Sequence, residues 1–322
     1  MDTDLKTLGL EIETLTGKLK DLKREIGKVI IGQDETVEQL LITFLAGGHA
    51  LLEGVPGLAK TLLIKTISEA LDLSFNRIQF TPDLMPSDII GSEILDEHRQ
   101  FKFVKGPLFS NIILADEINR TPPKTQAALL EAMQEKNVTA AGQLHVLPKP
   151  FFVLATQNPI EQEGTYPLPE AQLDRFMFHI ILDYPSFAEE VQVVKSTTGA
   201  AQAKVEKTLD EKSLIEFQEL IRKVPVSDNV IEYAVGLVSK TRPNTPGANE
   251  RVNEFIAYGA GPRASQYLIM GAKGHALMHG KFSPDIEDVQ AVAEPILRHR
   301  IVRNYKAEAE GISIENIIRS LF

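Results

Sequence analysis

Apolar side chains near the N-terminus recur every three or four positions, and charged residues fill the gaps between them. The apolar positions are Leu8, Ile12, Leu15, Leu19, Leu22 and Ile26. This spacing predicts an amphipathic helix over residues 5–27, inside an N-terminal segment that spans residues 1–28. Packing against its own domain is the favoured interpretation, because about three heptads give little length for the alternative, a coiled-coil contact.

The next part of the chain alternates short apolar runs with stretches of helical periodicity. The runs that predict strands are His49–Glu53, Phe75–Phe80, Ile112–Ala115, Phe151–Thr156 and Phe178–Leu182. Helices are predicted at Lys60–Leu73 and Pro122–Glu135. This alternation predicts an α/β domain over residues 29–195, in which helices flank a parallel sheet. Most runs are continuously apolar, as expected when both faces of a sheet are covered.

Two segments interrupt this alternation and have the pattern of β-hairpins. In residues 93–104, short apolar runs flank the polar turn Asp96–Gln100. In residues 138–147, the turn is centred on Ala141-Gly142-Gln143. Each hairpin lies just upstream of a predicted strand of the sheet, so the two are either inserts with a role of their own or surface decoration.

The composition changes after the last predicted strand. Residues 196–213 are rich in Ala, Thr, Lys and Glu and poor in large apolar side chains, which predicts a connecting helix or linker. Residues 214–322 show helical periodicity at 214–223, 229–239, 265–279 and 286–302. This pattern predicts a smaller all-α lid domain, interrupted by a loop over Arg242–Pro262 that holds three prolines and three glycines.

Composition and charge narrow the class of protein. The chain has no cysteine, which excludes disulfides and thiolate metal sites. No stretch reaches about 18–20 uninterrupted apolar residues, and the first residues lack the basic and apolar regions of a signal peptide. We therefore expect a cytoplasmic protein without a membrane span. A net charge of −10 disfavours nucleic acid as the main ligand, because neutralising its phosphates needs a basic surface.

The most specific signal follows the first predicted strand. A Gly-rich turn and a Lys-Thr pair open the next helix, in the order Gly54, Val55, Pro56, Gly57, Leu58, Ala59, Lys60 and Thr61. Backbone N–H groups of such a turn bind phosphate together with the positive end of the helix dipole. Lys60 would reach the β- and γ-phosphates of a nucleotide, and the Thr61 hydroxyl would bind Mg²⁺. Ala59 stands where glycine is usual, and alanine would be tolerated there if that residue is already helical.

Acidic and amide side chains follow two further predicted strands. Asp116 and Glu117 end one strand, where paired carboxylates are unusual because desolvating an unpaired charge is costly. Asp116 would hold Mg²⁺ through its water shell, and Glu117 would act as general base toward a water molecule. Asn158 would orient that water through its amide. Taken alone, however, an Asn before Pro is explained by a turn.

Two arginines and two histidines carry weaker signals. Arg175 is a candidate arginine finger, because its planar charged fork suits a transferring phosphoryl group. Arg263 begins a predicted helix, where an anion such as phosphate would compensate its charge. Either arginine alone is more often part of a surface salt bridge. His275 and His279 have the i, i+4 spacing of metal ligands, but the sequence shows no third ligand, so we predict no metal site there.

Taken in order, these segments resemble the MoxR-type family of AAA+ ATPases over nearly the whole chain. The resemblance is carried by Val29–Gln33 (VIIGQ), Gly48–Thr61 (GHALLEGVPGLAKT), Thr81–Gly91 (TPDLMPSDIIG), Ala115–Lys124 (ADEINRTPPK), Ala155–Pro159 (ATQNP), Gly164–Phe176 (GTYPLPEAQLDRF) and Gly261–Ala264 (GPRA). It implies a P-loop AAA+ fold. The implied roles are Walker A at Gly54–Thr61, Walker B at Asp116 and Glu117, sensor 1 at Asn158, the finger at Arg175 and sensor 2 at Arg263.

The resemblance also implies where the adenine and the neighbouring subunits lie. The adenine would lie near Ile31, Gly32 and Gln33. The two hairpins would face the pore of a hexameric ring, in which Arg175 completes the site of the next subunit. Arg263 would report the nucleotide state to the lid, and Arg120 would lie near a subunit boundary. Gly261 departs from the family pattern, in which Ser often precedes the Pro.

We therefore predict Mg²⁺-dependent hydrolysis of ATP to ADP. By resemblance, this activity serves chaperone-like remodelling or maturation of a partner, often a protein with a von Willebrand factor A domain. One alternative is a nucleotide-gated switch or scaffold with negligible turnover, against which the full set of catalytic residues speaks. Another is an AAA+ nucleic-acid motor, which the acidic balance disfavours. A P-loop kinase is weaker still, since nothing suggests a pocket for a small phosphate acceptor.

Overall fold

In the computed structural model, which describes residues 2–95, 97–160, 164–199 and 203–322, five parallel strands form a sheet in the order β2–β5–β8–β1–β9. The strands are β1 (Ala50–Gly54), β2 (Phe75–Gln79), β5 (Ile112–Asp116), β8 (Phe152–Gln157) and β9 (Phe178–Leu182). Each strand lies within one residue of its predicted bounds. The predicted α/β class, a parallel sheet flanked by helices with a helical lid, is confirmed.

The two faces of the sheet pack against different helices. Alternate residues of β5 show this, because Leu114 joins one apolar cluster and Ile113 joins the other. The cluster around Leu114 includes α2 (Asp34–Leu45) and α3 (Lys60–Ala70), whereas the cluster around Ile113 includes α5 (Pro123–Glu135). All five strands are parallel, so their carboxyl ends meet at one edge, where such sheets bind ligands.

The N-terminal helix α1 (Asp2–Gly27) lies on its own chain. The stripe positions Ile12, Leu15, Leu19, Leu22 and Ile26 are all buried in the cluster that includes α2 and α3. The helix also contacts lid helix α11 (Pro262–Met278). The stripe is thus used for packing within the chain and not for a coiled coil.

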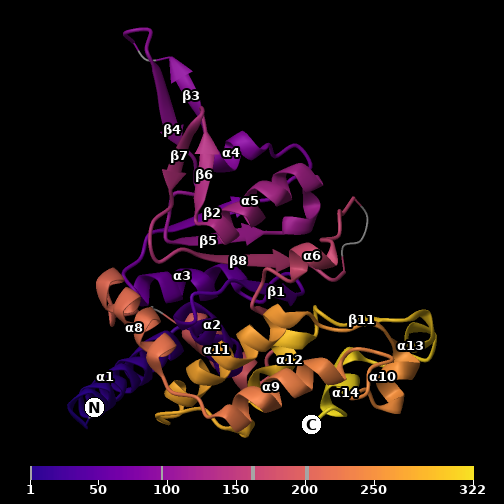
Figure 1. Cartoon of the computed structure of the whole chain (residues 1–322). Helices are drawn as coiled ribbons and strands as arrows, with labels where there is room; N and C mark the ends of the chain where they lie inside the picture. The colour runs from indigo at the N-terminus through magenta and orange to yellow at the C-terminus, as the bar shows by residue number, and fades with distance from the viewer. Residues whose placement is uncertain (1, 96, 161–163, 200–202) are drawn as a thin grey trace.

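Two hairpins project from one end of the sheet (Figure 1). The first pairs β3 (Gly91–Leu95) with β4 (Phe101–Lys105), and the second pairs β6 (Asn137–Ala140) with β7 (Gln143–Val146). Asp96 of the predicted first turn lies outside the described residues. Phe103 stacks on His145 with ring centroids 4.2 Å apart, so the hairpins contact each other near their bases. Large apolar side chains of both are exposed, among them Phe101 and Leu144.

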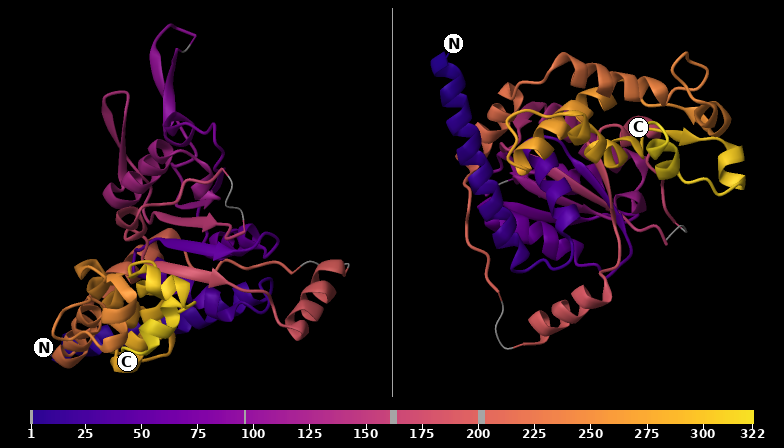
Figure 2. Two further views of the ribbon diagram at one scale, coloured as in Figure 1. Left: turned by 90° about the vertical axis from the view of Figure 1, so that its right-hand side faces the viewer. Right: turned by 90° about the horizontal axis from the view of Figure 1, so that it is seen from below.

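Part of the predicted linker is attached to the α/β domain. The linker begins at the end of α7 (Phe187–Thr198), a helix with no buried side chain that projects from the body of the molecule (Figure 2). From residue 203 to Asp210 the chain has no regular secondary structure. The Thr208 N–H donates to the Ala70 carbonyl at 2.8 Å, which fixes this segment at the end of α3. Residues 200–202 of the predicted linker lie outside the described residues.

The lid is helical, as predicted, but it contains more and shorter helices than the periodicity indicates. Its helices are α8 (Glu211–Lys223), α9 (Asp228–Lys240), α10 (Glu250–Phe255), α11, α12 (Ile286–Leu297), α13 (Tyr305–Ala309) and α14 (Ile314–Arg319). The predicted loop contains α10 and β10 (Ile256–Tyr258), which pairs with β11 (Val302–Arg303). The helix predicted over 286–302 ends at Leu297, because the chain turns there and directs Arg300 onto Asp174.

Smaller elements complete the chain: α4 (Pro86–Ile90), the short 3₁₀ helix η1 (Ile118–Arg120) and α6 (Glu170–Leu173). Within the described ranges, every helix is too short or too polar to cross a membrane.

Candidate functional site

The Gly-rich turn connects β1 to α3 and contains backbone conformations that most residues avoid. Gly57 has φ +89°, and Ala59, directly before the first residue of α3, has φ +56° and ψ +27°. The condition under which alanine was expected to be tolerated, a helical backbone, is therefore not met at Ala59. Ala59 lies in the left-handed region, where a Cβ crowds the following carbonyl oxygen at a cost of about 1–2 kcal/mol. This geometry explains why glycine is usual at the position.

Lys60 lies at the carboxyl edge of the sheet. Its ammonium donates to the Gly54 carbonyl and, at 3.3 Å, to the Gln157 carbonyl, which end β1 and β8. Burial lowers the pKa of Lys60, and nearby carboxylates, Asp116 first among them, oppose that shift. A partly buried ammonium held only by main-chain oxygens is well placed to bind an anion that enters between those strands.

Asp116 ends β5 and is held by neighbours on both sides. The Thr156 hydroxyl of β8 donates to Asp116 Oδ1 at 2.6 Å. On the other side, Arg77 of β2 donates to Asp116 Oδ2 through Nη2 at 2.5 Å and through Nε at 3.1 Å. These bonds fix the carboxylate at the sheet edge and balance its charge.

Glu117 follows directly and has a strained backbone, with φ +56°. Its N–H donates to the Thr156 hydroxyl at 2.9 Å. Its carboxylate accepts from Gln79 Nε2 at 2.8 Å and from Arg120 Nη1 at 3.3 Å. Left-handed residues other than glycine cluster at functional sites, where the surrounding structure enforces them. Here the enforced conformation turns the Glu117 side chain back beside β2.

A hollow of about 400 Å³ collects most of these groups. It is lined by Pro56, Gly57, Ala59, Lys60, Thr61, Arg77, Asp116, Glu117, Thr156 and Asn158. Asn158 Oδ1 accepts from the Ile160 N–H at 3.1 Å, whereas the buried Nδ2 has no hydrogen-bond partner. An unsatisfied buried donor is costly, and its presence at a hollow indicates a ligand or water that would complete it.

The predicted adenine-side residues lie next to the Gly-rich turn. Gln33 Nε2 donates to the Leu58 carbonyl at 3.5 Å, and Gln33 Oε1 is buried without a partner. Gly32 has φ +73°, and a Cβ there would lie 2.6 Å from the Glu189 side chain of α7. A side chain at this position would be strained by the positive φ and would have to displace the Glu189 side chain, so glycine is favoured here.

Arg175 and Arg263 are not brought to this hollow. They line a second one, of about 190 Å³, together with Tyr267 of α11. Arg263 Nη1 bonds with Asp174 Oδ2 at 2.9 Å, and the Tyr267 hydroxyl donates to the Arg175 carbonyl at 3.4 Å. The structure therefore separates the predicted residues into a phosphate-loop group and an arginine group.

Sequence reasoning missed three residues of the first group: Arg77, Gln79 and Thr156. Arg77 and Gln79 lie two positions apart on β2, so they point to the same side of the sheet. Gln79 is in register with Asp116 across the parallel pair. Two polar residues with strand spacing, in a strand placed beside the one that ends in the acids, are the signal that could have identified them.

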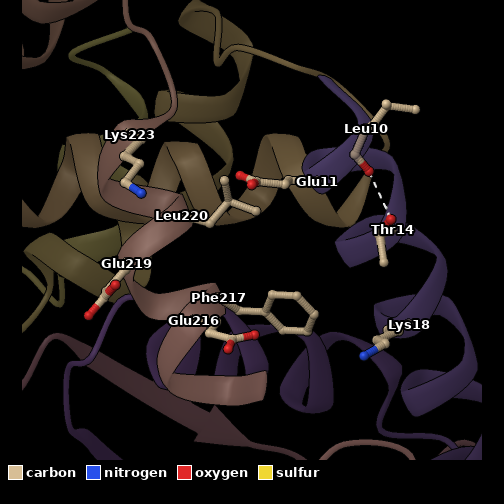
Figure 3. Close-up of a pocket in the computed structure, with 9 residues that line it drawn as sticks. All are labelled: Leu10, Glu11, Thr14, Lys18, Glu216, Phe217, Glu219, Leu220 and Lys223. Carbon is tan, nitrogen blue, oxygen red and sulfur yellow. Dashed lines mark hydrogen bonds between the residues drawn. The ribbon is translucent and has the colours of Figure 1, made fainter. Parts of the chain in front are cut away.

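A third hollow lies on α1 and α8, apart from both groups (Figure 3). Its lining combines apolar side chains such as Leu10 and Phe217 with charges of both signs, among them Lys18 and Glu216. None of the predicted site residues lines it.

Models of known protein families match the α/β domain and the lid. Residues 49–178 match the family described as the ATPase family associated with various cellular activities (AAA), and residues 248–321 match the AAA lid domain. A crystal structure from Cytophaga hutchinsonii, described as a candidate ATPase, has a TM-score of 0.93 to this structure. The two are 46% identical, and the match covers 99% of this chain and 97% of that one.

Similarity to known sequences extends over nearly the full length of the chain. The chain is 44% identical over 313 residues to the protein named Chaperone MoxR1 of Mycobacterium tuberculosis, covering 97% of this chain and 81% of that protein. It is 41% identical to the uncharacterised protein YeaC of Bacillus subtilis, in a match that covers 97% of this chain and 94% of that protein.

Proposed function

Because the chain belongs to the MoxR family of AAA+ ATPases, we propose that it hydrolyses ATP to ADP and phosphate as a Mg²⁺-dependent ring and remodels a partner protein. The observation that carries the proposal is the convergence of Lys60, Asp116, Glu117 and Asn158 on one hollow at the carboxyl edge of the sheet. A cation, two carboxylates and an amide around a Gly-rich turn are the groups that phosphoryl transfer requires.

The groups present fit a magnesium nucleotide. Thr61 and Asp116 offer the hard oxygen atoms that Mg²⁺ prefers. Asp116 already has Thr156 and Arg77 as partners, which suits contact through the water shell of the ion. When bound, Mg²⁺ would neutralise charge on the phosphate oxygens. The unpartnered Asn158 Nδ2 would donate at the γ-phosphate end, and the unpartnered Gln33 Oε1 would accept from the adenine amino group.

In the proposed reaction, Lys60 moves from the Gly54 carbonyl to the phosphates. Glu117 turns from Gln79 toward the attacking water, which Asn158 orients. The water oxygen bonds to the γ-phosphorus and its proton passes to the Glu117 carboxylate. The bond to the β,γ-bridging oxygen breaks, and ADP keeps the electron pair.

We assign Arg175 and Arg263 to the nucleotide of a neighbouring subunit in a ring, hexameric by family resemblance. Their shared hollow, apart from that of Lys60, supports this assignment. In this assignment, the nucleotide state that Arg263 reports to the lid is that of the neighbouring subunit. A positive charge supplied by the next subunit would stabilise the transition state only after assembly.

The biological role that we propose is chaperone-like remodelling or maturation of a partner, with proteins that contain a von Willebrand factor A domain as the first candidates. The relative named Chaperone MoxR1 supports the chaperone-like role. The exposed apolar side chains of the two hairpins, including Phe101 and Leu144, offer contact surface for a polypeptide.

A nucleotide-gated switch with negligible turnover is the second candidate. It is favoured by one observation: Gln79 and Arg120 hold the carboxylate of Glu117 beside β2, away from any base role. In this alternative, the nucleotide would bind without releasing Glu117.

The deciding experiment measures ATP hydrolysis against protein concentration, with Glu117→Gln in parallel. We expect activity that rises faster than linearly with concentration and falls at least about 100-fold in the variant, which should still bind ATP. Tight nucleotide binding without turnover at any concentration would contradict the proposal and favour the switch.

The arginine assignment has its own test. We expect Arg175→Ala to lower turnover by about 10³-fold, while the affinity for ATP changes only a few-fold, because the finger acts on the transition state from outside the subunit. Arg251→Ala, at an exposed position of α10, serves as the matched control. Near-normal turnover of Arg175→Ala would refute the finger assignment.

A further inference from the structure

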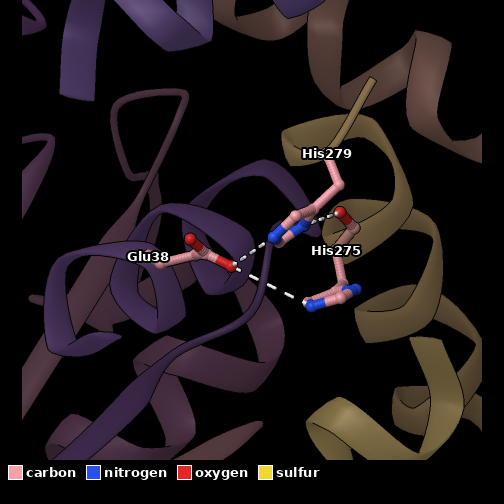
Figure 4. A group of neighbouring side chains, drawn as sticks. All are labelled: Glu38, His275 and His279. Carbon is pink, nitrogen blue, oxygen red and sulfur yellow. Dashed lines mark hydrogen bonds and ion pairs between the residues drawn. The ribbon is translucent and has the colours of Figure 1, made fainter. Parts of the chain in front are cut away.

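Three side chains from two domains meet between α2 and α11. They are Glu38 of α2 and His275 and His279 of α11, and one ligand atom of each lies within 4.8 Å of the others (Figure 4). Glu38 Oε1 is 3.7 Å from His279 Nε2 and 4.0 Å from His275 Nε2. The sequence showed the two histidines but not the third group, because Glu38 belongs to a helix far away along the chain.

Hydrogen bonds fix which ring nitrogen of each histidine faces Glu38. His275 Nδ1 bonds with Asp288 Oδ1 at 2.7 Å, and His279 Nδ1 bonds with the His275 carbonyl at 2.9 Å. Both partners are acceptors, so each Nδ1 carries its proton and donates. In the neutral rings, both Nε2 atoms therefore present lone pairs toward the carboxylate.

The acceptor behind His275 is firmly held. Asp288 is fully buried, and its carboxylate also accepts from the Asp285 N–H at 2.8 Å and from the Lys281 ammonium at 3.1 Å. A carboxylate that orients a ligating histidine through its other nitrogen is a recurrent support of metal sites. The present arrangement has that support before any ion is added.

The carboxylate of Glu38 is oriented from its other side. Lys23 of α1 donates to Glu38 Oε2 at 2.6 Å, which leaves Oε1 directed at the two histidines. The gaps of 3.7 and 4.0 Å from Oε1 to the Nε2 atoms exceed hydrogen-bond length, so hydrogen bonds do not close the cluster. Two lone-pair nitrogens and an anionic oxygen at these distances are arranged so that they can share a cation.

We propose that Glu38, His275 and His279 form a binding site for a divalent transition-metal ion, with Zn²⁺ as the best fit. Two histidines, one carboxylate and a water molecule are a familiar tetrahedral set for this ion. Zn–N and Zn–O bonds of about 2.0–2.2 Å require the three side chains to draw together by small rotamer changes. His279 is 47% exposed, which leaves a path for the ion and room for the water.

The site would join the two domains. Glu38 belongs to a helix of the nucleotide-binding domain, whereas α11 belongs to the lid and carries Arg263 in its first turn. A bound ion would therefore fasten the lid helix to α2 and restrict movement of Arg263 relative to the sheet. This inference stands apart from the proposed hydrolysis, because it concerns different residues and a nitrogen-binding metal.

The test uses the full chain, treated with a chelator and kept free of nucleotide. Co²⁺ is titrated while visible absorption is recorded, and Zn²⁺ is then added in competition. We expect one equivalent of Co²⁺ to give the intense bands of tetrahedral nitrogen and oxygen coordination, and Zn²⁺ to abolish them. Millimolar Mg²⁺ should not displace the ion, because Mg²⁺ prefers oxygen ligands.

Variants locate the site. His279→Ala and Glu38→Gln should each weaken Co²⁺ binding by at least about 10-fold, whereas His98→Ala, at an exposed histidine of the first hairpin, should leave it unchanged. Zn²⁺ should also raise the thermal midpoint of the wild type but not that of His279→Ala. Absence of a saturable one-equivalent site, or equal affinity in His279→Ala and the wild type, would overturn the proposal.

Discussion

At the scale of single residues, the phosphate-loop hollow is bordered by two left-handed residues that are not glycine. Ala59 and Glu117 both have φ +56°. Each conformation costs free energy that the surrounding contacts must offset. For Glu117, the Thr156 hydroxyl supplies one such contact. For Ala59, the gain is the first turn of α3, which opens directly at Lys60.

Replacing Ala59 by glycine distinguishes the observed left-handed conformation from a helical one. In a helix, Ala59→Gly would lower the free energy of unfolding by about 1 kcal/mol. In the left-handed region, glycine relieves the strain of the folded state, and this relief offsets the greater freedom of glycine in the unfolded chain. We therefore expect the free energy of unfolding to stay the same or to rise by up to about 1 kcal/mol. Urea denaturation of the two proteins measures the difference. A clear loss of stability would refute the left-handed assignment.

Residues that lie next to each other along the chain were easier to predict than those that meet in space. Lys60 and Thr61 were recognisable from the turn before them, and the structure places Lys60 with Asp116 around one hollow. Arg77 and Glu38 were not recognised, because each acts on a partner from another element. A single sequence carries no direct signal for such a pairing.

At the scale of elements, α1 shows how a narrow apolar stripe can attach a helix to its own domain. Leu19 is 1% exposed and belongs to the main apolar cluster, whereas Leu10, on the same helix, is 65% exposed. The two leucines differ only in the face of the helix on which they lie, so they form a matched pair.

We expect Leu19→Ala to lower the free energy of unfolding by about 3 kcal/mol, through lost burial and the cavity that it leaves. Leu10→Ala should change it by no more than about 0.5 kcal/mol. Thermal or urea denaturation compares the two variants. Equal effects would show that α1 does not pack on its domain through the predicted stripe.

His49 connects three elements of the nucleotide-binding domain. It lies just before β1, its Nδ1 accepts from the Val153 N–H of β8 at 3.0 Å, and its Nε2 bonds with the Met133 carbonyl of α5 at 3.1 Å. Burial lowers the pKa of His49 to about 4. The neutral ring thus satisfies one donor and one acceptor of the backbone, and protonation would disrupt the first.

This shift predicts acid sensitivity. Below the ordinary histidine pKa, the unfolded chain binds a proton that native His49 refuses, so stability falls as the pH drops from about 6.5 toward 4. From pH 7 to pH 5 the loss should be about 2 kcal/mol. The buried His299, whose pKa is also lowered by burial, adds to it in the same direction. His49→Asn should show a flatter dependence in urea denaturation, and an unchanged slope would contradict this account.

Element prediction was accurate where the apolar pattern was continuous. Strands such as β5 were located because their full burial requires uninterrupted apolar residues. The short elements α10, β10 and β11 were missed. Helix α10 has less than two turns and the two strands have too few residues to show an alternation of apolar and polar side chains. Helix α12 ended early because Arg300 binds Asp174, a contact that local periodicity does not contain.

At the scale of the whole molecule, functional groups lie at separate places around one sheet. The hairpins extend from one end of the sheet and the lid packs at the opposite end (Figure 1). The Lys60 hollow and the Arg175 hollow share no lining residue. This division is the basis of the assembly-dependent turnover proposed above, in which another copy of the chain supplies the arginine group.

The division of the two hollows has a genetic consequence. A Lys60→Ala subunit would keep a sound arginine face, and an Arg175→Ala subunit would keep a sound phosphate loop. Each variant alone would be inactive, yet a mixture would regain function wherever the second binds its nucleotide beside the first. With random assembly from equal amounts, about a quarter of the interfaces would be repaired. Two defective alleles expressed together could thus complement each other, whereas a subunit that carries both changes would inactivate both of the interfaces that it forms.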